Sequence, residues 1–236
     1  QSAKETIESG TKAAAAGGFT RVATMPNTKP VIDSAIIVDG LKYKIAAEGV
    51  VKVDIIGSLS KGLEGKELSS MGGMAKAGVV AFSDDGRYVQ NCDFMRKAME
   101  YAGMFGKIVI DHCEDADLIE GGHMHEGVVS HELGLKGRPA VAEDIAVARD
   151  ILLAEATGTA VHIAHISTKN AVQMVRQAKA KGLKVTAEAT PQHMILTDEA
   201  LRSYDPRFKV NPPLRSEEHR KAVVEGLVDG TIDAIV

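Results

Sequence analysis

Lys107-Ile108-Val109-Ile110-Asp111-His112-Cys113-Glu114-Asp115 is the stretch that decides the fold. Its aliphatic run ends at once in a histidine and an acidic cluster. This pattern is typical of a buried parallel strand that delivers a ligand at its carboxyl end. We therefore expect the functional site at the end of this strand, with His112 in it.

Two other segments repeat the arrangement. Gly78-Val79-Val80-Ala81-Phe82-Ser83-Asp84-Asp85-Gly86 ends in two carboxylates, and Val161-His162-Ile163-Ala164-His165-Ile166-Ser167 carries His165 at a comparable place. Neutral imidazole and carboxylate oxygen both suit Zn²⁺, and a catalytic zinc keeps one position open for water. Three strand ends that offer Asp, His and His predict a metal centre.

Helices and strands alternate along the whole sequence. The predicted strands cover residues 19–25, 50–59, 78–83, 107–111, 161–166, 183–189 and 232–236. The predicted helices cover residues 4–16, 34–48, 65–76, 93–105, 141–157, 168–181 and 216–229. Repeated βα units of this kind favour a parallel sheet, either an open doubly wound sheet or a closed (β/α)8 barrel.

Two observations favour the (β/α)8 TIM-type barrel. The candidate ligands lie at the ends of several different strands, as barrel enzymes place them, and no Gly-rich phosphate-binding motif follows the first strand. Seven of the eight strands are present, and the eighth is expected before Gln1. We expect residues 1–236 to form one catalytic barrel domain that is incomplete at both ends.

Composition narrows the class of protein. With 236 residues and 44% hydrophobic content the chain can bury a sizeable core, and a net charge of −4 without charge runs predicts neither nucleic-acid nor membrane-surface binding. The two cysteines, Cys92 and Cys113, form no metal or disulfide pattern, which favours a reducing compartment. No apolar run approaches the ~20 residues of a membrane span. We expect a cytoplasmic protein.

The strand period bears on which side chains meet. On an ideal strand His112 and His165 each lie on the side of the aliphatic residues two and four positions before them, so both can point into a barrel mouth. The alternative for each is a hydrogen-bonded core histidine. His162 has the opposite parity and is interpreted as structural. Strand parity does not choose between Asp84 and Asp85 as a metal ligand. The alternative role for either carboxylate is to cap the sharp turn that Gly86 makes.

Other polar residues have plainer interpretations. The long irregular stretch 115–139 is typical of a functional or mobile loop. Five histidines are interpreted as solvated: His123, His125, His131, His193 and His219. Glu114 and Asp115 could support a histidine nitrogen or begin the next helix, and we favour the helix. Asn27 and Asn211 lie in proline-fixed loops, where an amide can bind substrate or form an ordinary Asx turn.

At this point the sequence resembles class I, long bacterial-type dihydroorotases of the amidohydrolase superfamily. The resemblance covers essentially the whole chain. Six motifs carry it, in order: 13–20 (AAAAGGFT), 25–28 (MPNT), 82–86 (FSDDG), 111–115 (DHCED), 162–168 (HIAHIST) and 211–215 (NPPLR). The family interconverts N-carbamoyl-L-aspartate and L-dihydroorotate in pyrimidine (UMP) biosynthesis at a zinc centre.

The resemblance assigns roles to five residues. It implies that Asp85, the second carboxylate of its turn, and His112 and His165 bind one or two Zn²⁺ ions, and that Asn27 and Asn211 contact the substrate. Two family segments are absent: an HxHxR motif expected just before Gln1 and a catalytic aspartate expected just after Val236. No catalytic residue is therefore expected within this chain, and we expect the 236 residues alone to be inactive.

Two alternatives stay open. A related cyclic amidase, a hydantoinase or allantoinase, typically has a carboxylated lysine at the fourth strand end, and residues 81–85 contain no lysine. A non-catalytic dihydroorotase-like subunit would scaffold aspartate transcarbamoylase, but such proteins often lose the ligands that are present here. We expect a small-molecule substrate and a homodimer, with aspartate transcarbamoylase as a candidate partner.

Overall fold

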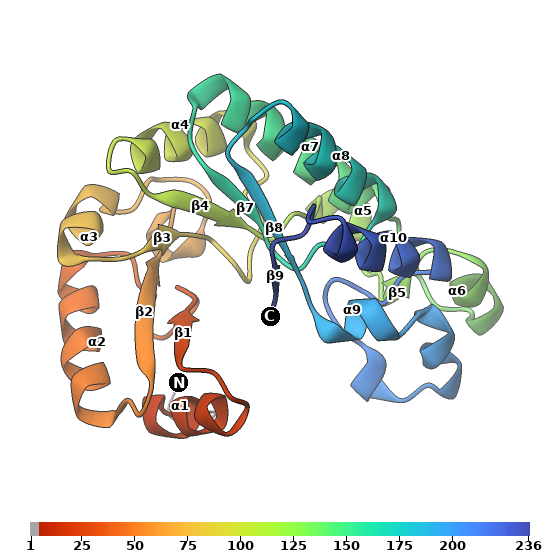
Figure 1. The fold of residues 1–236 in the computed structure, drawn as a ribbon, viewed down its shortest axis with the longest axis horizontal. Helices are drawn as coiled ribbons and strands as arrows, with labels where there is room; N and C mark the ends of the chain where they lie inside the picture. The colour runs from red at the N-terminus through yellow and green to blue at the C-terminus, as the bar shows by residue number, and fades with distance from the viewer. Residues whose placement is uncertain (1–4) are drawn as a thin grey trace. The chain divides into compact units, whose positions relative to one another are not determined.

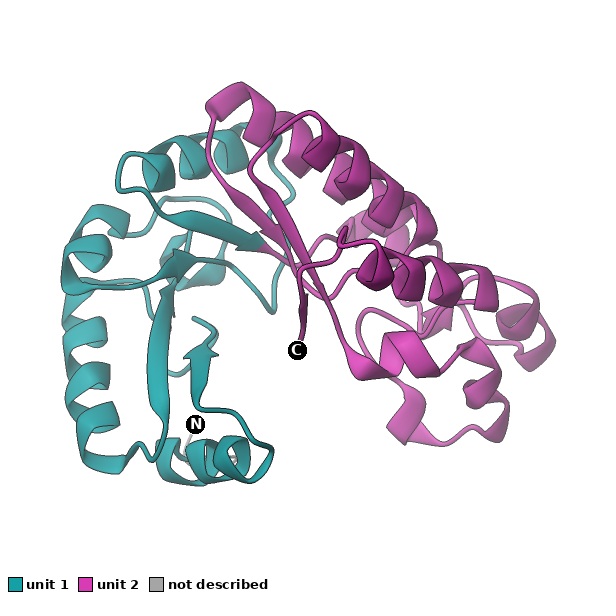
Figure 2. Ribbon diagram, in the orientation of Figure 1, with its two compact units in different colours: residues 1–110 teal, residues 111–236 magenta. Residues whose placement is uncertain are grey.

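The computed structural model describes residues 5–236. The chain divides into two compact units, residues 1–110 and 111–236 (Figure 2). The prediction of a single catalytic domain stays a prediction. Residue 4, where the first helix was expected to begin, lies outside the described residues.

Unit 1 is a run of βα repeats (Figure 1). Its strands are β1 (Arg21–Thr24), β2 (Lys52–Gly57), β3 (Ala81–Phe82) and β4 (Ile108–Asp111), whose last residue opens unit 2. Its helices are α1 (Ile7–Ala16), α2 (Ala35–Glu48), the short 3-10 helix η1 (Lys61–Leu63), α3 (Met71–Ala77) and α4 (Cys92–Gly103). The strands pair in parallel and in sequence order.

Local signals explain where these elements begin and end. Asn91 caps α4, since its side chain accepts a hydrogen bond from the Phe94 N–H at 2.9 Å. Gly78 ends α3 in the left-handed conformation (φ +94°), which glycine adopts without cost. The aromatic ring of Phe82 and the side chains of Met74 and Met95 are fully buried and form much of the core.

Unit 2 continues the alternation with β7 (Val161–Ile163), β8 (Val185–Ala189) and β9 (Ala234–Ile235). The helices α7 (Val141–Thr157), α8 (Lys169–Ala180) and α10 (Glu217–Val228) separate or precede these strands. Pairing is again parallel, with Val161 opposite Val185 and Glu188 opposite Ala234. Alternate residues of β8 are buried, as expected of a strand with one face against helices.

Two stretches that lie outside the predicted helices and strands are partly ordered into short elements. Residues 115–139 contain α5 (Ala116–Ile119), β5 (Met124–His125), α6 (Val128–Leu133) and β6 (Gly137–Arg138), and β5 pairs with β6 in parallel. A later stretch contains α9 (Pro191–Ile195), η2 (Asp198–Ser203) and η3 (Pro206–Phe208). The two stretches share a small core that we call the satellite core: Met124, Val129, Leu201 and Leu214.

The hydrogen-bonded strand order is β1-β2-β3-β4-β7-β8-β9. All seven predicted strands are present, and the sheet is of the parallel type that TIM-barrel enzymes use. In the described part of the chain, no helix combines the length and the apolar character that crossing a membrane would require.

Candidate metal centre

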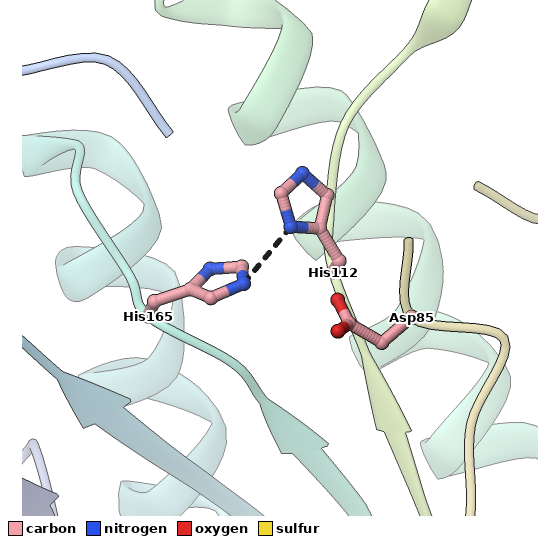
Figure 3. Close-up of side chains that lie close together, drawn as sticks. All are labelled: Asp85, His112 and His165. Atoms are coloured by element: carbon pink, nitrogen blue, oxygen red, sulfur yellow. Dashed lines mark hydrogen bonds between the residues drawn. The ribbon is translucent and has the colours of Figure 1, made fainter. Parts of the chain in front are cut away.

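Two histidines meet in unit 2. His112 directly follows β4, and His165 lies two residues beyond the end of β7. The Nδ1 atom of His112 is 2.9 Å from the Nε2 atom of His165, and the rings lie edge to face with their centroids 4.5 Å apart (Figure 3). Two imidazole nitrogens that face each other can share a proton in a hydrogen bond, or both can coordinate one cation. The sequence prediction that these two residues converge is confirmed.

The backbone conformation of His165 indicates a functional role for this residue. Its φ angle is +36°, in the left-handed region that non-glycine residues seldom occupy. Holding such a residue there costs about 1–3 kcal/mol, and positions of this kind cluster at functional sites. The structure therefore maintains the ring of His165 in place at an energetic cost.

The second nitrogen of the His112 ring faces a buried carboxylate. Nε2 lies 3.2 Å from Oε2 of Glu114, whose side chain is almost fully buried. A carboxylate behind a ligating histidine fixes the tautomer and makes the other nitrogen a better ligand. The preference for Glu114 as the start of a helix was wrong, because it is Asp115 that caps α5 through the N–H groups of Asp117 and Leu118.

Asn211 and Arg138 complete this side of His112. Arg138 Nη1 donates to Asn211 Oδ1 at 2.7 Å and lies 3.4 Å from Glu114 Oε1. Because the guanidinium occupies the amide oxygen, the Asn211 NH₂ group faces Glu114 Oε2 (3.4 Å) and His112 Nε2 (3.2 Å). Arg138 was not predicted as a site residue, because it lies in β6, a two-residue strand that the sequence pattern does not reveal.

Asp84 and Asp85 have different surroundings in unit 1. The buried Asp84 carboxylate accepts hydrogen bonds from the N–H groups of Leu59 (2.8 Å) and Ser60 (3.0 Å) and from the Ser60 hydroxyl. Burial raises its pKa, and these hydrogen bonds act in the opposite direction. Asp84 is thus engaged in holding the chain after β2, which leaves Asp85, the third residue labelled in Figure 3, as the ligand candidate.

Asn27 lies against the turn that follows Asp85. A side chain at Gly86, which has φ +91°, would come within 2.9 Å of Asn27 Nδ2. Glycine is therefore needed at 86 both for its backbone conformation and for the close approach of the amide. The loop around Asn27 and the turn at Asp85, which are 58 residues apart (85 − 27), are neighbours within unit 1.

The remaining histidines divide into exposed and structural ones. His123 and His131 are exposed, as predicted, and His162 is hydrogen-bonded on both nitrogens, to Thr186 Oγ1 (2.7 Å) and Glu188 Oε2 (3.0 Å). His125 and His193 are buried, so their prediction as solvated residues was wrong. Burial, Arg215 and His219 lower the pKa of His125 to about 3.

A second group with ligand-type side chains lies behind His112. It consists of the buried residues Asp111, Cys113 and Asp150. The Arg149 guanidinium donates to Asp111 Oδ2 at 2.8 Å and to Asp150 Oδ1 at 2.7 Å. Since an arginine already supplies the positive charge, we interpret this group as structural. Burial raises the pKa of the Cys113 thiol, with both carboxylates adding to the effect.

Unit 1 also contains a cavity of about 660 Å³ among α1, β1 and α2. Its lining is mainly apolar and includes Val22, Ile32 and Leu41. Among the residues that the structure describes, its lining contains no His, Cys or Asp, and its one carboxylate is that of Glu5. We therefore do not assign it to the chemistry.

Comparison with known proteins places the chain in a family. Residues 1–171 match the model of a family described as Dihydro-orotase-like. A protein named dihydroorotase from Pelotomaculum thermopropionicum is 58% identical over 99% of this chain and 54% of its own length. Another of that name from Geobacter metallireducens is 54% identical over 98% of this chain and 55% of its own length. The chain spans about half the length of the curated relatives it matches.

Solved structures agree on the fold. The L-hydantoinase from Arthrobacter aurescens matches with a TM-score of 0.83 at 22% identity, over 98% of this chain and 52% of that one. A D-hydantoinase matches with a TM-score of 0.79 at 22% identity, over 98% and 53%. At this identity the likeness shows a shared fold and nothing about substrate. Because the family model matches residues 1–171 of the 236, the chain belongs to the dihydro-orotase-like family.

Proposed function

We propose that the protein is a dihydroorotase, a zinc-dependent enzyme that reversibly cyclises N-carbamoyl-L-aspartate to L-dihydroorotate in pyrimidine (UMP) biosynthesis. The observation that carries the proposal is the His112–His165 pair, whose facing nitrogens are 2.9 Å apart, in a chain of this family. We place the reaction in the cytoplasm. We predict a homodimer, with aspartate transcarbamoylase as a candidate partner.

Asp85, His112 and His165 would hold one or two Zn²⁺ ions. Together they offer one carboxylate and two imidazoles, which is the donor chemistry of zinc. The parallel register of β3 and β4, with Ala81 opposite Ile108, supports the set, because both strands then release their following residues at the same edge. Zinc supplies Lewis acidity when bound, which lowers the pKa of water and polarises a carbonyl.

The protein's own residues bind and orient the substrate in this proposal. Asn27 and Asn211 offer amides, and the Arg138 contact occupies the Asn211 amide oxygen and turns its NH₂ group toward the Glu114 carboxylate, so Asn211 acts as a donor. A donor of this kind suits a carboxylate or ring carbonyl oxygen. Glu114 keeps the His112 Nε2 proton in place and leaves Nδ1 as the ligating nitrogen.

Two competing functions predict different assays. A hydantoinase or allantoinase would act on another cyclic amide, and residues 81–85 lack the lysine that those enzymes typically carry there. A scaffold subunit would have no activity and no need for a metal, although it would leave the His112–Glu114 contact without a purpose.

The test uses the natural full-length protein that contains this chain. We expect both hydrolysis of dihydroorotate and cyclisation of carbamoyl aspartate. We also expect bound zinc by elemental analysis and no turnover of hydantoin or allantoin. His112→Ala and His165→Ala should each abolish activity and lower zinc content, whereas the exposed control His131→Ala should do neither. Wild-type zinc and turnover in either ligand variant would refute the assignment.

A further inference from the structure

One buried guanidinium in unit 2 touches both the turn after His165 and the elements around the satellite core. Arg215 ends the segment that carries Asn211, and its side chain is almost fully buried, like that of Glu143 in the first turn of α7. Neither residue contacts His112 or His165 in the hydrogen bonds described above, so the proposed chemistry does not account for them.

On one side the guanidinium meets the turn that follows His165. Its Nε donates to Ser167 Oγ at 3.1 Å and its Nη2 donates to Glu143 Oε2 at 3.4 Å. Glu143 Oε1 in turn accepts the N–H groups of Ser167 (2.7 Å) and Thr168 (3.0 Å). The carboxylate thus holds the backbone two and three residues beyond His165.

On its other side the same guanidinium contacts the segments that surround the satellite core. Nη1 donates to the backbone carbonyl of Arg138 at 3.1 Å and lies 3.4 Å from His125 Nδ1. The carbonyl of Arg215 itself accepts the N–H of Asp198 at 3.0 Å. Strands β5 and β6 and the segment from η2 to Asn211 are therefore tied to the same residue.

We propose that Arg215 and Glu143 are positioning residues that set Arg138 and Asn211 against the His112–His165 pair. The inference rests on the proposed function for its kinetic readout. A buried ion pair adds little stability compared with an apolar pair of the same size, so its value here lies in geometry. Only the five-donor fork of arginine can serve Ser167, Glu143 and the Arg138 carbonyl at once.

Three variants of the full-length protein test this. Arg215→Met removes the fork, Glu143→Gln keeps an acceptor oxygen for the two N–H groups, and the double variant leaves no unpaired buried charge. The matched control is Arg220→Met, since Arg220 pairs with Glu217 and donates to the Met194 carbonyl in the same unit. Readouts are zinc content, kcat and KM for dihydroorotate, thermal unfolding, and amide hydrogen exchange of residues 122–138.

We expect Arg215→Met to keep wild-type zinc, raise KM by about tenfold to a hundredfold with a smaller change in kcat, and speed exchange in residues 122–138. The double variant should recover thermal stability and keep the raised KM. A double variant with wild-type KM, or Arg215→Met with a lower melting temperature alone, would show that the pair is purely structural.

If the wild type lacks dihydroorotase activity, the proposed function fails. Amide hydrogen exchange still tests the positioning role, because unchanged exchange of residues 122–138 in Arg215→Met overturns it.

Discussion

Asp84 and Asp85 are adjacent carboxylates with different tasks. Asp85→Ala should remove bound metal and lower activity of the full-length protein more than about a hundredfold, because a ligand is lost. It should leave the unfolding free energy of the metal-free protein within about 0.5 kcal/mol of wild type, since Asp85 lies in a half-buried turn.

Asp84→Ala should act through stability instead. It strands the buried N–H groups of Leu59 and Ser60, and we expect a loss of about 2–4 kcal/mol in unfolding free energy. Urea unfolding in chelator and metal analysis separate the two effects. Loss of metal in Asp84→Ala with retention in Asp85→Ala would reverse our assignment.

His125 should make the protein sensitive to acid. Its pKa is lowered to about 3 by burial first, then by Arg215 and His219, so between pH 6.5 and 3 the unfolded chain binds a proton that the folded chain does not. Its contribution is complete above about pH 6.5 and is lost as the pH falls, by roughly 2–3 kcal/mol at pH 4.5.

His125→Gln keeps an acceptor near Arg215 and cannot titrate. Urea unfolding at pH 7.5 and 4.5 should show a smaller loss of stability for His125→Gln than for wild type. An equal loss in both proteins would mean that other groups, such as the buried His193, cause the acid sensitivity.

Whether a site residue could be predicted depends on the kind of element that positions its side chain. His112 and His165 could be found because they follow strands whose aliphatic runs are visible in the sequence. Glu114 and Arg138 could not, because their roles depend on a turn direction and on a two-residue strand without periodicity. Strand parity does not choose between Asp84 and Asp85. The family resemblance implies Asp85, and the hydrogen bonds of Asp84 to the Leu59 and Ser60 N–H groups add a physical reason.

Two helix glycines respond in opposite ways to an added methyl group. In α10, a Cβ on Gly226 would lie 2.9 Å from Val172 Cγ1 of α8 and 3.1 Å from Ile232 Cδ1. We expect Gly226→Ala to lower the unfolding free energy by about 1–3 kcal/mol through overpacking, despite the better helix propensity of alanine.

Gly40 in α2 is the matched control, because a Cβ there meets nothing within 4 Å. Gly40→Ala should raise the unfolding free energy by about 0.5–1 kcal/mol. Chemical denaturation of both variants measures the pair, and a stabilised Gly226→Ala would show that α8 and α10 pack more loosely than described.

The main βα repeats were predictable, and the short elements inside residues 115–139 and 191–208 were not. Aliphatic runs revealed all seven strands of the sheet, including the short strands β3, β7 and β9, and α7 was predicted at 141–157 and is observed there. β5 and β6 have two residues each and owe their form to the satellite core, which joins residues that are 72 to 90 positions apart (201 − 129 and 214 − 124). A local pattern cannot report such a contact.

For the whole molecule, bound metal should appear as thermal stability. A ligand that binds only the folded state stabilises it by about 2.7 kcal/mol at a free concentration of one hundred times its Kd. The full-length protein should therefore melt several degrees lower after chelation, and zinc should restore the loss. His112→Ala should melt at the same temperature with and without chelator, and a wild-type shift in that variant would place the stabilising metal elsewhere.

The contrast between the two cysteines has a practical use. Cys92 is exposed at the first residue of α4, whereas Cys113 is buried between carboxylates that raise its thiol pKa. Reactivity follows the thiolate and its exposure, so a maleimide dye applied to the native protein should modify Cys92 and spare Cys113. Peptide mapping would check this. A fluorescent or spin probe can then be attached at a single known position, the first residue of α4, without mutagenesis.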